Sequence, residues 1–299
     1  MKLIPLLLAL FVPAVVPRFS TVQTQTPQQV ADELLAADRA FAAAGAKTDL
    51  ITAISAMFTA DVAMPAPGGY AFGSQRAVEA LKANPANTGA KATWSPARVG
   101  ISRDGFHGFT AGFMTITRAD GSMAPAKYLA YWVKQKEGWR VAVYKRTAAK
   151  EVPANVKVTY LLPERIMVSM MAPERDAKNR ESLMEAERSF AADAQKIGLG
   201  AAFKKYGSAD AINLGGPNVP VFSWGNEEIG TLVGQNEPAG GSSVNWGPDK
   251  AIVAITGYFG VTMGYITRNT PGPDGKTPPP NPFFTIWRLE AGGWRYIAE

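Results

Sequence analysis

The sequence contains no cysteine and a single histidine, His107, among its 299 residues. Without cysteine, disulfide bonds, thiolate catalysis and lipid attachment through an N-terminal cysteine are excluded. One histidine cannot build a cluster of imidazole metal ligands, nor a Ser-His-Asp triad in each half of the chain. No Gly-rich loop follows a strand and opens a helix, so nucleotide binding has no support. The sequence therefore predicts no metal site and no cofactor.

Long runs of basic or apolar residues are also scarce. The net charge is +6, but the Lys and Arg residues are scattered, so no nucleic-acid partner is expected. The longest apolar stretch, 3–16, follows Lys2 and is shorter than the ~20 residues of a membrane span. It is typical of a secretory signal peptide, which we assign to residues 1–22. We expect a periplasmic or secreted protein with no membrane contact after signal removal.

One pattern occurs twice. Residues 108–115 read GFTAGFMT and residues 260–267 read GVTMGYIT. The segments LLAADRAF at 34–41 and LMEAERSF at 183–190 also correspond, and tryptophans recur in register between the two halves. The spacing between copies changes only in Gly/Pro-rich stretches, which is where loops tolerate insertions. The sequence therefore predicts a duplicated domain, with copies at 28–147 and 178–299 joined by a linker at 148–177.

Each copy predicts the same order of elements. An amphipathic helix opens the copy, a second helix covers 50–61 or 199–210, and a third begins near Gly73 or Gly225. Segments 92–102, 108–117, 126–135 and 139–145 then alternate or are rich in β-forming residues, with Asp-Gly and Glu-Gly turns between them. We predict an α+β fold in which three helices pack in a curved antiparallel sheet.

The helix order, the Gly-x-Thr-x-Gly strand, the Tyr-x-x-x-Trp strand and the closing Gly-Trp resemble the NTF2-like superfamily. Within it, the chain is most similar to the SnoaL-like/DUF4440 branch, the cone-shaped relatives of ketosteroid isomerase. The resemblance covers both copies and implies two tandem cone domains, each with a hydrophobic pocket between helices and sheet. Members of this superfamily include enzymes, binding modules and dimerisation domains, so the fold alone does not determine the function.

The resemblance also implies where an isomerase would carry its catalytic groups. A base would follow helix two, a second acid would lie on the late strand, and a tyrosine would lie on helix one. Proton abstraction needs such a positioned base, so steroid isomerase activity is not expected. The residues at these positions in copies one and two are Ala66 and Gly215, Ala130 and Thr285, and Ala42 and Ala191.

Aromatic side chains occupy the late strand instead. Because strand residues alternate between faces, Tyr128 and Trp132 share a face with Ala130, and Phe283 and Trp287 are their counterparts in copy two. If this face lines the cone, these four side chains form a wall for an apolar or aromatic ligand. The alternative is that they fill the cone.

Catalytic candidates are few and lie in copy one. Tyr128 has a hydroxyl that can donate to an oxyanion where copy two has Phe283, and His107 is a candidate acid or base where copy two has Phe259. Asp38 is a third candidate, since a helical acid followed by arginine recurs in both copies. The alternative for His107 is a structural role.

The arginines of this recurring pair, Arg39 and Arg188, are candidate anchors for an anionic group. The alternative is that they brace the first helix of each copy against neighbouring carboxylates.

Three functions remain open at this stage. The first is an exported protein that binds a small apolar or aromatic molecule, with catalysis weak or absent. The second is a lyase or hydratase that acts on an aromatic or polyketide-like substrate in copy one. The third is a structural dimerisation module with filled cones. In each case we expect the sheets of the two copies to pair within the chain, because each has an apolar outer face. These faces hold Phe113, Leu129, Tyr131, Tyr265, Phe284 and Ile286.

Overall fold

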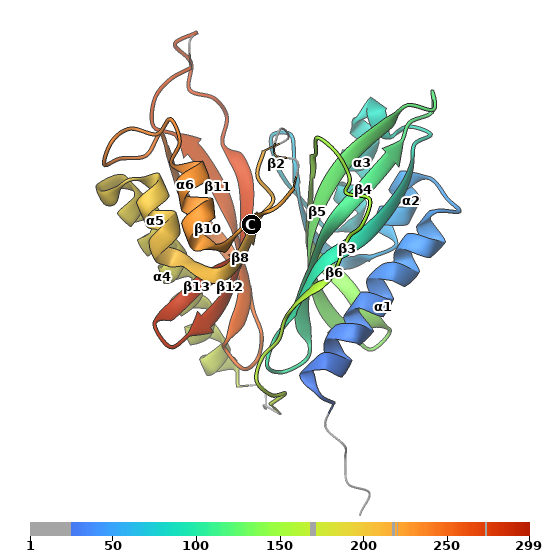
Figure 1. The fold of residues 1–299 in the computed structure, drawn as a ribbon, viewed down its shortest axis with the longest axis horizontal. Helices are drawn as coiled ribbons and strands as arrows, with labels where there is room; N and C mark the ends of the chain where they lie inside the picture. Colours follow the sequence, from blue (N-terminus) through green and yellow to red (C-terminus); the bar gives the residue numbers. More distant parts are fainter. Residues whose placement is uncertain (1–24, 168–171, 217–218, 220, 273) are drawn as a thin grey trace, which may run out of the picture.

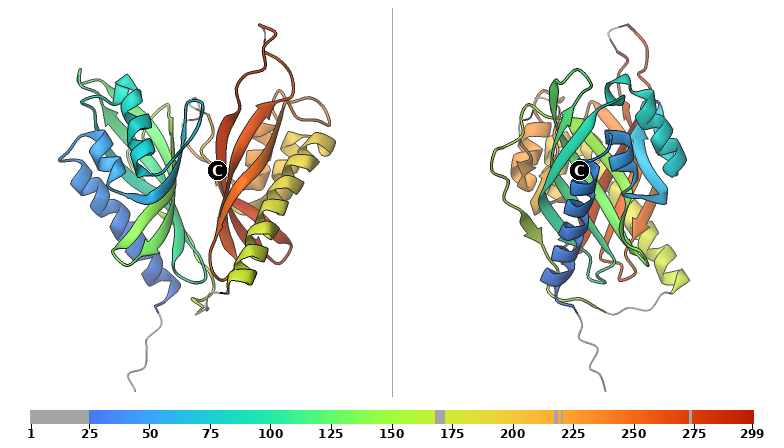
Figure 2. Two further views of the ribbon diagram at one scale, coloured as in Figure 1. Left: turned by 180° about the vertical axis from the view of Figure 1, so that it is seen from behind. Right: turned by 90° about the vertical axis from the view of Figure 1, so that its right-hand side faces the viewer.

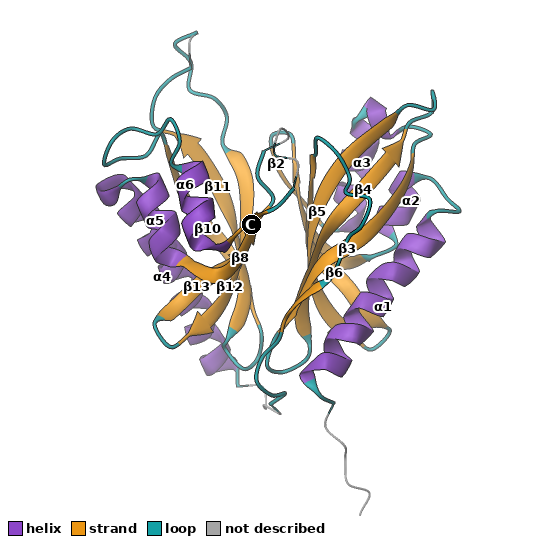
Figure 3. Cartoon of the chain, in the orientation of Figure 1, coloured by secondary structure: helices purple, strands orange, loops and turns teal. Residues whose placement is uncertain are grey.

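The computed structural model describes residues 25–167, 172–216, 219, 221–272 and 274–299. The predicted signal peptide, 1–22, lies outside the described residues, and so does the Met-rich segment 168–171 of the predicted linker. The helices and strands form two similar groups with the same order of elements (Figure 3).

The first group forms domain 1. Its first helix begins with a capping box, in which the Thr26 hydroxyl accepts from the Gln29 amide at 3.2 Å and the Gln29 side chain accepts from the Thr26 amide at 2.8 Å. Helix α1 buries Val30, Leu34 and Leu35 against the sheet. The elements are α1 (Pro27–Gly45), α2 (Leu50–Ser55), β1 (Phe58–Ala66), β2 (Gly69–Phe72), α3 (Ser74–Ala83), η1 (Pro85–Asn87), β3 (Lys91–Ile101), β4 (His107–Thr117), β5 (Met123–Gln135) and β6 (Gly138–Ala148).

The second group, domain 2, repeats this order after the linker. Its elements are α4 (Pro173–Ile197), α5 (Leu199–Tyr206), β8 (Gly207–Asn213), β9 (Ser223–Trp224), α6 (Gly225–Val233), β10 (Val244–Val253), β11 (Phe259–Arg268), β12 (Asn281–Glu290) and β13 (Gly293–Ala298). The sheet orders also correspond, with β2-β1-β6-β5-β4-β3 in domain 1 and β9-β8-β13-β12-β11-β10 in domain 2.

The predicted second helices are too long. Helix α2 ends at Ser55 and α5 ends at Tyr206, and the following residues form strands β1 and β8. The reason is tertiary pairing, because β1 runs parallel to β6 and β8 runs parallel to β13. Each otherwise antiparallel sheet therefore contains a parallel pair that local sequence patterns did not indicate.

The predicted linker contains regular structure. Strand β7 (Thr159–Leu161) pairs in parallel with β3 and extends the domain 1 sheet at its edge. Helix α4 begins at Pro173, inside the range predicted as linker. The linker backbone thus satisfies its hydrogen bonds partly on domain 1 before it enters domain 2.

The two sheets face each other, and the helices lie on the outer flanks (Figures 1 and 2). Between the sheets is one buried apolar cluster with contributions from both domains. Tyr131 of domain 1 stacks on Phe259 of domain 2 with ring centroids 5.8 Å apart, and Phe109 stacks on the same ring at 6.4 Å. The apolar outer face of each sheet, which would otherwise be exposed to water, is thus covered by the sheet of the other domain.

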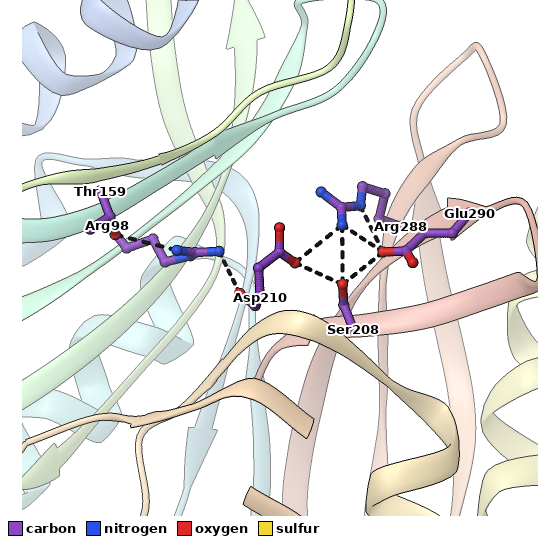
Figure 4. Close-up of polar contacts among 6 residues, drawn as sticks. All are labelled: Arg98, Thr159, Ser208, Asp210, Arg288 and Glu290. Atoms are coloured by element: carbon purple, nitrogen blue, oxygen red, sulfur yellow. Dashed lines mark hydrogen bonds and ion pairs between the residues drawn. The ribbon is translucent and has the colours of Figure 1, made fainter. Parts of the chain in front are cut away.

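Polar contacts at one edge of this interface also join the domains (Figure 4). The Arg98 guanidinium donates to the backbone oxygen of Asp210 at 2.5 Å, and it lies over the Trp224 ring at 5.2 Å. The Asp210 carboxylate in turn accepts from Arg288 and Ser208, at 3.1 and 2.7 Å. This network positions β3 of domain 1 against β8 of domain 2.

Candidate functional site

The interior of domain 1 is organised around one buried acid. Asp38 on α1 has no exposed surface, and its two carboxylate oxygens accept from Trp94 Nε1 at 2.7 Å and from the Tyr128 hydroxyl at 2.8 Å. Next to this pair, Trp132 Nε1 donates to the Thr110 hydroxyl at 2.8 Å. Burial raises the pKa of Asp38, while the Tyr128 hydrogen bond lowers it.

Domain 2 repeats the arrangement with a longer acid. Glu187 on α4 is fully buried and accepts from Trp246 Nε1 at 2.7 Å, from the Thr262 hydroxyl at 2.5 Å and from Trp287 Nε1 at 3.1 Å. Burial raises the pKa of Glu187, and the bond from Thr262 acts against it. Phe283 stands where domain 1 has Tyr128, so this cone lacks the phenol.

A cavity of ≈ 300 Å³ lies beside Glu187, between α4, α5, α6 and the domain 2 sheet. Most of its wall is apolar, and Thr285 and Gly215 lie at the positions where the family resemblance would have placed an acid and a base. An apolar cavity with a few convergent polar groups is the usual form of a small-molecule site. Its apolar wall consists of Phe190, Leu199, Phe203, Leu214, Val233, Val244, Trp246, Ile266, Phe283 and Phe284.

The wall of this cavity has four further polar residues, Lys145, Thr147, Asn213 and Glu299. Asn213 Nδ2 donates to the Glu299 carboxylate, and Lys145, which belongs to domain 1, reaches the Phe284 carbonyl with its Nζ at 3.5 Å. Burial raises the pKa of Glu299 to about 7, and burial lowers the pKa of Lys145 to about 8. The cavity wall therefore holds an acid and a base that both titrate near neutral pH.

His107 lies away from both cones. Along β4, His107, Phe109 and Phe113 point toward the other domain, whereas Thr110 points into the cone of domain 1. The His107 Nδ1 lies 2.9 Å from the Tyr131 hydroxyl, and burial lowers the pKa of His107. The structure therefore does not bring His107 together with Asp38 and Tyr128, and the position of His107 fits the structural alternative.

The two arginines predicted as anion anchors do not line a cone. Arg39 is exposed on α1. Arg188 forms ion pairs with Glu181 and Glu185 on the solvent side of α4. On each helix, the neighbouring acid points inward and the arginine points outward, so a ligand-binding role does not fit either arginine and bracing of the helix fits Arg188.

The four aromatic residues predicted to form a ligand wall have different surroundings in the two domains. Tyr128 and Trp132 are fully buried in the core of domain 1, and their polar atoms are bonded to Asp38 and Thr110. In domain 2, Phe283 lines the cavity, while Trp287 is buried outside the cavity wall and donates to Glu187. Sequence reasoning missed Lys145, Asn213 and Glu299, because no local pattern marks residues that meet only in the tertiary structure.

Among the described residues, no group of His, Asp or Glu side chains is arranged to hold a metal ion. None of the described helices is long and apolar enough to cross a membrane.

No family model matches the sequence, and no curated protein matches it either. Solved structures do resemble it. They include a protein of unknown function with a cystatin-like fold from Nostoc punctiforme, at 16% identity over 44% of this chain and 98% of the other, with a TM-score of 0.34. An NTF2-like protein from Novosphingobium aromaticivorans matches at 16% identity over 41% and 84% of the two chains, with a TM-score of 0.31. A Catenulispora acidiphila protein in complex with S-DNPA matches at 17% identity over 39% and 91%, with a TM-score of 0.30.

Each of these structures corresponds to less than half of this chain. The fold of the chain follows from its own elements, since three helices and a curved sheet occur twice in the same order. This confirms the predicted α+β fold of two tandem domains, each with three helices packed on a curved sheet. The assignment to the SnoaL-like/DUF4440 branch stays a prediction.

Proposed function

We propose that the protein binds a small apolar or aromatic molecule in the cavity of domain 2. The observation that carries the proposal is the ≈ 300 Å³ cavity with its mostly apolar wall. The contact of such a ligand with Phe190, Phe283 and Trp246 would remove apolar surface from water, which is the main source of affinity in sites of this kind. The polar groups of Thr285 and Asn213 would orient it.

The proposal places the ligand in one of the two predicted cones, that of domain 2. In domain 1, Tyr128 and Trp132 are packed and bonded, which supports the filled-core alternative for that part of the cone. In domain 2, Phe283 leaves Glu187 without a phenol partner and faces the cavity. The open cavity thus occurs in the domain where phenylalanine, Phe283, stands in place of the hydrogen-bonded Tyr128.

The test uses a pair of adjacent residues on α6. Val233 lines the cavity, whereas Leu232 is exposed. We expect Val233→Trp to fill the cavity and to weaken binding of the fluorescent apolar probe 1-aminoanthracene by about tenfold or more, and Leu232→Trp to leave it unchanged. Titrations of probe fluorescence measure both. Equal affinity in the two variants would refute the proposal.

Native mass spectrometry of protein purified from its own cells gives a second readout. A small molecule that remains bound to the wild type and to Leu232→Trp, but is absent from Val233→Trp, would identify the natural ligand. A bound molecule of equal occupancy in all three proteins would place the ligand elsewhere.

Acid–base catalysis in the same cavity is a second candidate. It is favoured by Glu299, whose pKa is raised to about 7, and by the Lys145 ammonium group on the same wall. An enzyme of this kind would give a rate that depends on a group with a pKa near 7, and Glu299→Gln would remove that dependence. A panel of aromatic substrates, assayed across pH 5–9, tests it; activity that survives in Glu299→Gln excludes this role.

We also propose that the protein is exported and acts as a monomer. The apolar segment 3–16 supports export, and cell fractionation with an antibody to the chain tests it. The mutual burial of the two sheet faces supports a monomer, because these faces cover each other and not a second copy. Light scattering coupled to gel filtration should give the mass of one chain.

A further inference from the structure

A second cavity, of ≈ 530 Å³, lies in domain 1 between the end of β1, the end of α3 and β6. Its apolar wall includes Met64, Pro65 and Leu81. Three of its polar residues, Tyr144, Lys145 and Arg146, follow one another on β6. This cavity is separate from the one in domain 2, although Lys145 lines both.

The charges around this cavity have one sign. Lys145 and Arg146 are the charged residues of its wall, and no Asp or Glu of the described chain lines it. The carboxyl that acts on Tyr144 from the interior is Asp38, and its oxygens already accept bonds from Trp94 and Tyr128. The wall of this cavity therefore holds no carboxylate, and the carboxyl that acts on Lys145, Glu299, lies on the domain 2 cavity instead.

Two hydrogen-bond donors in this wall are unpaired. Within the described part of the chain, neither the Tyr144 hydroxyl nor Arg146 Nη1 has a hydrogen-bond partner, and both atoms are buried. A buried donor without an acceptor is costly, so native structures pair nearly all of them with protein, water or ligand. Burial raises the pKa of Tyr144 to about 12, so the hydroxyl stays a donor at neutral pH.

The guanidinium is also held in place. Arg146 Nη2 donates to Asn87 Oδ1 at 2.6 Å, and the buried Asn87 donates through Nδ2 to the Leu81 carbonyl at 2.6 Å. Asn87 thus fixes one nitrogen of the guanidinium against the end of α3 and leaves the other without a partner. An ordered guanidinium loses less conformational entropy when it binds an oxyanion.

We infer that this cavity of domain 1 is a binding site for small carboxylates with an apolar body. Arg146 Nη1 and the Tyr144 hydroxyl donate to the carboxylate oxygens, and Met64, Pro65 and Leu81 contact the apolar part. Small side-chain rotations at the site, which are common on ligand binding, bring the two buried donors to the ligand.

Met64 provides a local reporter for the test. In protein labelled with ¹³C-methyl methionine, the Met64 signal is assigned by its loss in Met64→Leu. We expect benzoate to shift this signal saturably, and the neutral probe benzyl alcohol to bind about tenfold more weakly or worse, since it lacks the charge-assisted bonds.

Two substitutions separate the proposed contacts from general charge effects. Arg146→Met should weaken the binding of benzoate by about tenfold or more. Arg76 is exposed on α3 outside the cavity wall, so Arg76→Met makes the same change of net charge and should leave the affinity for benzoate unchanged. Tyr144→Phe disturbs the fold less than Arg146→Met does, and it should weaken the binding of benzoate by roughly three- to tenfold.

Three results would overturn the inference. These are the absence of a benzoate-dependent shift of Met64, equal affinity for benzoate and benzyl alcohol, and equal affinity in Arg146→Met and Arg76→Met. Val233→Trp distinguishes this site from the proposed function, because it fills the domain 2 cavity and should leave the Met64 response intact. A Met64 response that disappears in Val233→Trp would also contradict the inference.

Discussion

Two acids, Asp38 and Glu187, are buried at corresponding points of the two domains, and each is surrounded by donors. Tryptophan indoles bond to both, and the remaining lone pairs accept from a tyrosine in domain 1 and from a threonine in domain 2. A buried carboxyl is tolerated only where its oxygens are paired. These acids therefore join the first helix of each domain to its sheet.

The Tyr128 hydroxyl should matter for stability because it pairs a buried carboxyl. Tyr128→Phe leaves one Asp38 oxygen without its donor and should cost about 1–3 kcal/mol. The matched change Tyr144→Phe removes a hydroxyl that has no partner in the described chain and should cost much less. Urea unfolding of both variants makes the comparison, and equal losses would show that the Asp38 bond contributes nothing.

The acid in the domain 2 cavity should make stability depend on pH. The pKa of Glu299 is raised from 4.5 to about 7, so the folded state binds this proton more tightly than the unfolded state does. Its contribution to stability is full below pH 4.5 and is lost as the pH rises through 7. Lys145 on the same wall acts against this shift.

Glu299→Gln removes this dependence, so the wild type should lose about 1–3 kcal/mol more than the variant between pH 4.5 and pH 7.5. Urea midpoints measured at both pH values check the expected difference. Glu137→Gln, at an exposed position, is the control and should behave as the wild type. A wild type whose stability rises across this range relative to Glu299→Gln would reverse the sign and disprove the assignment.

The repeated Gly-x-Thr-x-Gly strand is explained by what its residues contact. A Cβ on Gly108 or Gly260 would lie 2.6 or 2.7 Å from a leucine of the first helix, so these glycines let the helix approach the sheet. The central threonines, Thr110 and Thr262, accept from the indole nitrogens of the next strand. The pattern thus encodes the contact of a helix, a bent strand and a buried polar centre.

The second glycine of the pattern should be intolerant of any side chain. A Cβ on Gly112 would meet the Ser95 carbonyl at 2.2 Å, next to the irregularity where β3 bends at Pro96. We expect Gly112→Ala to cost about 2 kcal/mol or more, because backbone must move. Gly247→Ala meets nothing within 4 Å and is the control. Thermal unfolding that is equal for both variants would contradict this account of the motif.

The described part of the chain is a pair of similar domains whose sheets cover each other. The cluster between the sheets is as well buried as the core of either domain, and cationic side chains lie over aromatic rings across it, including Lys145 over Phe284 at 4.7 Å and Arg103 over Tyr258 at 4.1 Å. This packing brings Lys145 of domain 1 to the wall of the domain 2 cavity. Domain 2 alone would lack this part of its cavity wall.

A charge between the sheets should therefore uncouple the domains. Met263 is 4% exposed in the shared cluster, whereas Met123 is 72% exposed on β5. We expect Met263→Asp to lower the unfolding free energy by about 3 kcal/mol or more and to split one unfolding transition into two, and Met123→Asp to change little. Differential scanning calorimetry measures both. A single, unshifted transition in Met263→Asp would mean that the domains do not stabilise each other.

Much of the fold was readable from local patterns. The repeat placed both copies, helix periodicity placed α1 and α4, and strand alternation correctly assigned Tyr128 and Trp132 to the inner face and Leu129 and Tyr131 to the outer face. These predictions succeeded because they depend on spacing along one helix or strand. The ends of α2 and α5 were missed, since the parallel pairing that extends β1 and β8 joins segments far apart in sequence.

The candidate sites depend on longer-range packing. His107 stood out as the single histidine and Arg39 by its recurrence beside an acid in both copies. The alternation of β4 and the helical periodicity of α1 nevertheless turn these side chains away from the cone. The domain 2 cavity and the unpaired donors of Tyr144 and Arg146 arise from how side chains of distant elements fill space. The amino-acid pattern specifies which face of each element is buried. Whether a buried face is filled or hollow depends on the volumes that meet there, and these are set only when helices, sheets and the two domains come together.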